Sequence, residues 1–173
     1  MSPWFGKKPE NKPSPATRVP LVRVGELLTA ESVWIVPGAA EKATLIDTLV
    51  AKVCEAHHLS DPQALAAKVR EREQGISTTL DTGLSLPHAR LDALNELAAG
   101  LAVAPGGVAD PQSGQKIRAM FLFFSPNKPE HFARHLQVLR SVAVLFKPDL
   151  IDELAKCATP AQALEMLRQR EPA

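Results

Sequence analysis

Residues 119–124 read Ala-Met-Phe-Leu-Phe-Phe, an unbroken apolar run bounded by polar and proline residues. Apolar residues in such a run, without polar alternation, indicate a central strand that is covered on both faces. Two shorter apolar stretches, at 33–36 and 101–104, indicate further strands, and the first closes at the turn signal Pro37-Gly38. We therefore expect a sheet built around residues 119–124.

Helical patterns lie between and after these strands. Apolar residues recur every four positions at 45, 49 and 53, which predicts a helix over 41–57. Asp61-Pro62 supplies an N-cap and an N1 proline, so a second helix should run to about Gln74-Gly75. Further helices are expected over 132–146, around 150–154 after Pro148, and from Thr159-Pro160 onward. Strands interspersed with helices predict an α/β fold with a small mixed β-sheet sandwiched by α-helices.

The composition indicates one globular domain, preceded by a segment that is rich in proline and basic residues. The 173 residues are 45% hydrophobic and 23% charged, ordinary values for a chain with a single core. Residues 1–20 are rich in proline and basic side chains and cannot bury enough apolar surface to order themselves. We expect a flexible tail at 1–20 and a domain at 21–173.

Charge and hydropathy exclude several functional classes. A net charge of +1 and 5% aromatic residues do not suit a nucleic-acid binder. Neither an apolar run of about 18 residues nor a secretory signal is present, so we expect no integral membrane segment and a cytoplasmic location. Cys54 and Cys157 lack metal-ligand spacing and are expected to be reduced thiols.

The tripeptide Leu86-Pro87-His88 is the strongest chemical signal. Imidazole is neutral near physiological pH and can attack phosphorus, and the preceding proline reduces the freedom of the loop that carries it. Upstream, Arg72-Glu73 supplies a guanidinium and Ser77-Thr78 supplies hydroxyls, groups that match phosphate oxygens. Short extended segments are expected at 77–80 and 84–87, around a turn at 81–83. The pattern favours a histidine that accepts and releases a phosphoryl group.

Each of these residues also has a simpler interpretation. His88 alone could be a structural or solvated loop histidine, and Arg72 could form a surface salt bridge within the run 70–73. Thr78 could be an ordinary turn hydroxyl. His131 and His135 are spaced i, i+4 and could bind zinc, but position 132 is Phe and no third ligand has a clear spacing.

Taken together, the motifs resemble the enzyme IIA domain of the fructose/mannitol class (type 2) of the bacterial phosphotransferase system, including its nitrogen-regulatory branch. The match comprises Arg-Glu at 72–73, Ser-Thr at 77–78 and Gly-Leu-Ser-Leu-Pro-His at 83–88. A second block, His-Leu-Gln-Val-Leu at 135–139, follows in the right order. The resemblance covers about residues 21–171 and implies the fold of that family.

The resemblance also implies roles for individual residues. His88 matches the phosphorylated histidine, which takes its group from the small carrier HPr, while Arg72, Thr78 and His135 match groups beside it. The group then passes to a cysteine of a IIB component in the transport branch, or the phosphorylation state is read by a target protein in the regulatory branch. A free-standing chain fits the regulatory branch better, and a non-phosphorylated interaction module of the same fold is a third possibility. No metal, nucleotide or other cofactor is implied.

Three positions depart from the family pattern. Ala89 stands where a glycine usually follows the histidine, and Thr79 and Asp81 stand in a turn where glycines are common. Alanine disfavours a positive φ, so the loop is expected to differ in shape. The Asp81 carboxylate would oppose a nearby phosphate unless it turns away.

Overall fold

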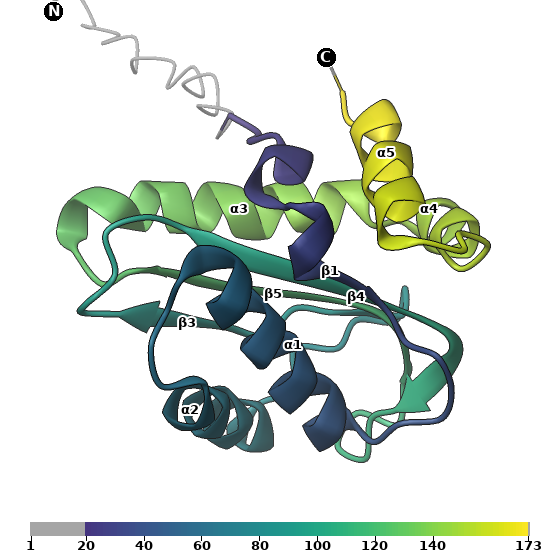
Figure 1. The fold of residues 1–173 in the computed structure, drawn as a ribbon, viewed down its shortest axis with the longest axis horizontal. Coiled ribbons are helices and arrows are strands. Elements are labelled where there is room, and N and C mark those ends of the chain that lie inside the picture. The colour runs from purple at the N-terminus through teal and green to yellow at the C-terminus, as the bar shows by residue number, and fades with distance from the viewer. Residues whose placement is uncertain (1–19, 173) are drawn as a thin grey trace, which may run out of the picture.

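The computed structural model describes residues 20–172 and shows a five-stranded sheet between two layers of helices (Figure 1). The predicted tail at 1–20 lies almost wholly outside the described residues. The strands are β1 Val33–Ile35, β2 Leu84–Ser85, β3 His88–Leu91, β4 Ala98–Ala109 and β5 Lys116–Pro126. The helices are α1 Lys42–His57, α2 Pro62–Gly75, α3 Phe132–Leu145, α4 Pro148–Leu154 and α5 Pro160–Arg170, with short 3-10 turns at Val24–Leu27, Ala30–Ser32 and Pro129–His131. The predicted α/β fold is confirmed.

Strand β5 lies at the centre of a mixed sheet, as its apolar run predicted. One edge pairs antiparallel with β4, which in turn pairs parallel with β1. The other edge pairs parallel with β2 and then, farther along, with β3. The sheet therefore places β3 directly beside the carboxyl end of β5.

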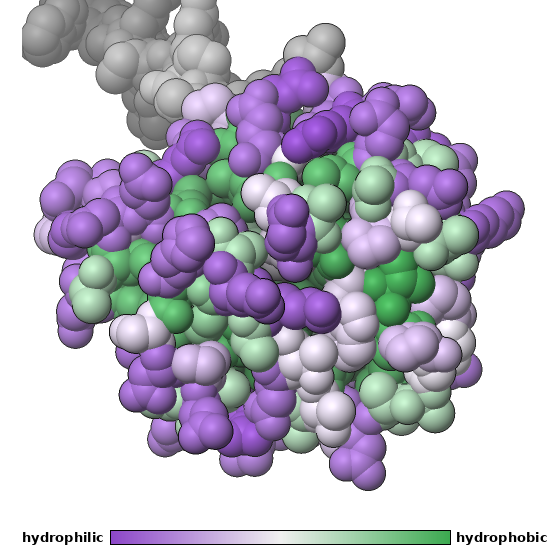
Figure 2. Space-filling model, viewed as in Figure 1, coloured by the Kyte–Doolittle hydropathy of each residue, from purple (hydrophilic) through white to green (hydrophobic). Residues whose placement is uncertain are grey.

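Alternation along β5 divides the core into two apolar layers. Phe121 and Phe123 pack toward α3, α4 and α5, whereas Leu122 and Phe124 pack toward α1 and α2. All four side chains are fully buried. On the face shown in Figure 2, hydrophilic side chains surround smaller apolar areas. In the described part of the chain no helix has both the length and the apolarity needed to cross a bilayer.

Local signals in the sequence explain where the helices begin. Asp61 caps α2 by accepting a hydrogen bond from the Ala64 N–H, and Pro62 occupies its first position. Thr159 caps α5 in the same way through the Gln162 N–H. The Gln162 side chain then accepts from the N–H of Ala158, one residue before the cap, which is a capping box shifted by one position.

Two local predictions near the candidate histidine were wrong. Residues 77–80 form no strand and contribute only an isolated bridge between Thr79 and Ser85. His88 lies at the first position of β3, opposite Phe123, instead of on a loop. The reason is that β5 extends beyond the apolar residues 119–124 as far as Pro126. Its edge there offers backbone groups with which residues 88–91 pair.

Gly100 permits α1 to pack closely on β4. A Cβ added at this position would lie 2.5 Å from Val53 Cγ2 and 3.1 Å from Leu49 Cδ1, both side chains of α1. We predict that Gly100→Ala lowers the free energy of unfolding by about 1–3 kcal/mol, because α1 must move away from the sheet. Urea denaturation measures this change. Gly106→Ala on the same strand meets nothing within 4 Å and should change stability by less than about 0.5 kcal/mol; equal effects would contradict the packing argument.

Candidate functional site

A cleft of about 680 Å³ opens between the end of α2, the loop that follows it and the start of β3. Three of the residues singled out in the sequence, Arg72, Thr78 and His88, line this cleft together. The fourth, His135, approaches from α3, and the centroid of its ring lies 5.3 Å from that of His88. The fold thus brings all four predicted site residues into one region, from α2, the loop after it, β3 and α3.

The ring of His88 is held by one hydrogen bond and one stacking contact. Its Nδ1 lies 2.8 Å from the carbonyl oxygen of Leu86, and its face stacks on Phe123 at a centroid distance of 5.4 Å and an angle of 14°. A carbonyl oxygen can only accept, so Nδ1 carries the proton. The lone pair of the neutral ring is therefore on Nε2.

His135 is buried and neutral. The pKa of its imidazole is lowered from 6.5 to about 4, mainly by burial and to a smaller extent by the nearby His88, Arg90 and Arg72, in that order. Its Nδ1 lies 2.6 Å from the hydroxyl of Ser125, which is itself buried on β5. His135 is therefore a packed, hydrogen-bonded histidine beside His88.

The hydroxyl group of Thr78 makes hydrogen bonds within the protein both as a donor and as an acceptor. The hydroxyl donates to Glu73 Oε1 at 2.5 Å and accepts from the N–H of Leu86 at 3.2 Å. The N–H of Thr78 also donates to Glu73. Because the Thr78 hydroxyl already donates to Glu73, it has no proton left for a phosphate oxygen. Its bond from the Leu86 N–H holds the residue whose carbonyl oxygen orients His88. This geometry favours a structural role for Thr78 over a phosphate contact.

A buried ionic cluster supports the loop that carries Thr78. Lys42 Nζ lies 3.0 Å from Glu73 Oε2 and 3.1 Å from Asp110 Oδ2, and all three side chains are at most 9% exposed. Ser77 donates to the same Asp110 oxygen at 2.5 Å. No sequence motif marks this cluster, because its members are far apart on the chain and each lies in an ordinary local context.

Hydrogen bonds keep the Asp110 carboxyl ionised despite its burial. Desolvation by itself raises the pKa of Asp110, but hydrogen bonds from Ser77, the Gln112 N–H and Lys42 outweigh it and hold the pKa far below its usual range. The cluster therefore stabilises the fold with Asp110 in its charged form.

Two guanidinium groups lie near the pair of histidines. Arg72 is exposed at the rim of the cleft, and its charged neighbours pair elsewhere, Arg70 with Asp47 and Glu73 with Lys42. Arg90, which the sequence analysis missed, stands two residues after His88 on β3 and donates to the carbonyl oxygens of Lys128 and Pro126. Side chains at i and i+2 of a strand share a face, a signal that could have identified Arg90 once β3 was known.

The three departures from the family pattern leave this geometry intact. Ala89 is fully buried, pairs with Phe124 and does not have a positive φ, so alanine is accommodated without strain. Thr79 donates to Ser85 Oγ at 3.2 Å. Asp81 is exposed and is not among the residues that line the His88 cleft.

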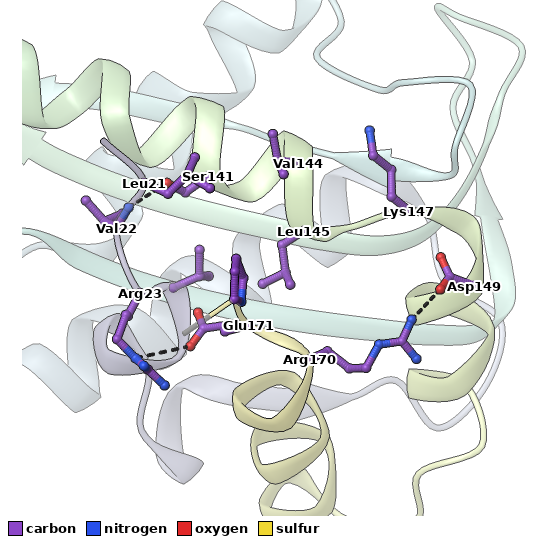
Figure 3. A pocket seen from close by; sticks show the side chains of 12 residues that line it. Leu21, Val22, Arg23, Ser141, Val144, Leu145, Lys147, Asp149, Arg170 and Glu171 are labelled. Atoms are coloured by element: carbon purple, nitrogen blue, oxygen red, sulfur yellow. Dashed lines mark hydrogen bonds and ion pairs between the residues drawn. The ribbon is translucent and has the colours of Figure 1, made fainter. Parts of the chain in front are cut away.

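A second cavity, of about 650 Å³, lies where the segment at residues 21–24 meets the end of α3 and the end of α5 (Figure 3). Four of its charged side chains form ion pairs, Arg170 with Asp149 and Arg23 with Glu171. None of the predicted site residues lines it. Within residues 20–172, no three His, Cys, Asp or Glu side chains gather as potential metal ligands.

Comparison with protein families gives a direct assignment. Residues 26–170 match the family described as "Phosphoenolpyruvate-dependent sugar phosphotransferase system, EIIA 2". The chain belongs to this EIIA type 2 family. As a member, it is a phosphocarrier domain of the phosphotransferase system, which agrees with the resemblance found in the sequence motifs.

Individual relatives of this EIIA type 2 domain are distant in sequence. The chain is 23% identical over 152 residues to the fructose-specific EIIABC component of Bacillus subtilis (strain 168), covering 87% of this chain and 24% of the length of that relative. Its fold is similar to that of nitrogen regulatory protein IIA-Ntr from Neisseria meningitidis, with a TM-score of 0.69, 21% identity and coverage of 83% of this chain and 98% of that one. It is also similar to IIA mannitol in a complex with phosphorylated IIB mannitol from Escherichia coli, with a TM-score of 0.63, 20% identity and coverage of 82% and 97%.

The buried cluster makes stability depend on pH in a defined direction. The folded pKa of Asp110 is depressed, so its contribution is complete above the unfolded value of about 3.9 and is lost as the pH falls below it. We predict that Asp110→Asn lowers the free energy of unfolding by about 3 kcal/mol at pH 7. Urea denaturation should show that this difference is unchanged at pH 5 and smaller at pH 3. Asp81→Asn, at an exposed position, is the control, and a difference that stays constant down to pH 3 would refute the assignment.

Proposed function

We propose that this chain is a phosphohistidine carrier of the nitrogen-regulatory type, and that Nε2 of His88 accepts its phosphoryl group from an HPr-like protein. The observation that carries this proposal is the hydrogen bond from Nδ1 of His88 to the carbonyl of Leu86. It leaves Nε2 as the nucleophile of a half-buried ring that lines an open cleft. A neutral nucleophile in a fixed orientation is what phosphoryl transfer requires.

The transfer exchanges one phosphorus–nitrogen bond for another. The Nε2 lone pair of His88 forms a bond to phosphorus while the bond to the donor histidine breaks, and that electron pair returns to the donor ring. His88 keeps its Nδ1 proton throughout, and its developing positive charge is stabilised by the Leu86 carbonyl oxygen. No proton has to leave His88 during the step.

Positive charge around the site favours the phosphorylated state. A phosphoryl group brings nearly two negative charges at pH 7, and Arg72 at the rim of the cleft is the main candidate to contact it. Arg90 adds a second positive charge near His135, although hydrogen bonds to the backbone hold it in place. His135, neutral and buried beside His88, can offer a hydrogen bond without changing its charge.

The surroundings of His88 also suit a protein partner. Ile76 in the lining of the cleft is 81% exposed, and Phe132 and Leu136 on α3, close to His135, are 49% and 44% exposed. Exposed apolar side chains around a reactive group are typical of a docking surface. We assign this surface to the HPr-like donor and to the acceptor in turn.

The regulatory branch is the first candidate, and similarity to IIA-Ntr supports it. In that branch a target protein reads the charge of phosphorylated His88 in the cytoplasm. The second candidate is a sugar-transport IIA that passes the group to a IIB cysteine, supported by the fructose-specific relative and the IIA–IIB mannitol complex. Purified IIB proteins distinguish the two: a regulatory protein retains its label, whereas a transport IIA loses it to IIB within the time of the assay.

Labelling tests the central claim. Incubation with radiolabelled phosphoenolpyruvate, enzyme I and HPr should produce acid-labile, base-stable label on the protein. His88→Ala should abolish this label because the acceptor nitrogen is removed. His131→Ala, a partly exposed histidine outside the cleft, should leave it unchanged. Absence of label from the wild type would instead support an interaction module that is not phosphorylated.

Arg72 gives a second test. Arg72→Gln removes a charge-assisted hydrogen bond worth about 1.5–3 kcal/mol, so we predict that the rate of His88 phosphorylation falls about 10-fold to 150-fold. Arg70→Gln is the matched control, since it lies on the same helix and pairs with Asp47 instead of lining the cleft. Rapid-quench measurement of phosphorylation by HPr gives both rates. Equal losses in the two variants would mean that Arg72 has no specific role.

A further inference from the structure

The hydroxyl of Ser125 and the ring of His135 form a buried pair that the family motifs do not include. Ser125 is on β5, 1% exposed, and its Oγ lies 2.6 Å from Nδ1 of His135. His135 is 6% exposed and lies on α3. The contact therefore joins the central strand to the helix that covers it, directly beside His88.

The direction of this hydrogen bond follows from the partners that each group has. Among the described residues, Nδ1 of His135 is the one partner of the Ser125 hydroxyl. If Nδ1 carried the proton, the serine proton would be buried without an acceptor, a costly arrangement. The serine therefore donates, Nδ1 accepts, and the proton of the neutral imidazole is on Nε2.

We propose that Ser125 is a positioning residue that holds His135 in the Nε2–H tautomer, so that His135 presents a hydrogen-bond donor to the group carried by His88. This rests on the proposed function of His88. The two rings then have opposite tautomers: His88 has its lone pair on Nε2, and His135 has its proton there. One nitrogen can bind phosphorus, and the other can donate to a phosphoryl oxygen.

The alternative tautomer of His135 would oppose the reaction. A lone pair on Nε2 beside His88 would face the negative oxygens of the phosphoryl group and repel them. A serine at position 125 excludes this arrangement without adding charge to a buried site. Ser125 acts through His135 and needs no contact with the phosphoryl group.

Nitrogen-15 NMR of the unphosphorylated protein tests the tautomers directly. We expect His135 to show a protonated Nε2 and an unprotonated Nδ1, and His88 to show the reverse. In Ser125→Ala, the Nδ1 signal of His135 should shift and the Nδ1–H tautomer should become detectable. A wild-type His135 that carries its proton on Nδ1 would overturn the proposal whatever the activity of the protein.

Phosphorylation rates test the consequence. Ser125→Ala should slow phosphorylation of His88 by HPr about tenfold, since one hydrogen bond to the transition state is no longer oriented. Ser125→Thr, which keeps the hydroxyl, should stay within about twofold of the wild type. Ser141→Ala is the matched control, because Ser141 is buried on α3 like His135 but accepts from the Val22 N–H.

Three outcomes would contradict the positioning role of Ser125. A wild-type rate in Ser125→Ala would show that the hydroxyl has no role in transfer. An equal loss in Ser141→Ala, or no recovery in Ser125→Thr, would indicate a general packing effect. If the wild type takes no label at all, the proposed function fails, and the NMR measurement still decides whether Ser125 donates to His135.

Discussion

The burial of β5 on both faces is the constraint from which the rest of the structure follows. Its side chains supply both apolar layers, so neither helical layer could assemble without it. One edge is closed by β4, and the other edge is left to pair with residues that arrive from α2. Pairing at that second edge places His88 opposite Phe123, beside His135 of α3. The reactive ring is thus placed by backbone pairing with the buried central strand.

Within this frame, three polar side chains near the site each have a definite hydrogen-bond partner. The Thr78 hydroxyl donates a hydrogen bond to Glu73, Nδ1–H of His88 donates one to the carbonyl oxygen of Leu86, and the Ser125 hydroxyl contacts Nδ1 of His135. A buried donor or acceptor left without a partner is costly, so these hydrogen bonds restrict the tautomers and orientations that the site can adopt. The exposed groups, Arg72 above all, are free to respond to a charge that arrives from outside.

Much of this arrangement could be predicted from the sequence because its signals are local. The apolar run at 119–124, the N-cap of Asp61 and the proline before His88 act through neighbours on the chain. Strand β3 was missed because residues 88–91 have no strong strand pattern and become extended only by pairing with β5. Arg90 was missed for the same reason. The Lys42, Glu73 and Asp110 cluster joins three distant positions that carry no common motif.

The fold class, the five helices, the central strand and the residue types available for phosphoryl chemistry could be predicted from the linear chain, since periodicity, capping and spacing are properties of that chain. The packing of the folded chain sets which nitrogen of His88 carries its proton, and which partners the hydroxyl groups of Thr78 and Ser125 contact. These choices depend on which donors and acceptors share a buried space. Such sharing is decided when strand and helix pack, because the energy of a hydrogen bond depends on distances that the linear sequence does not contain.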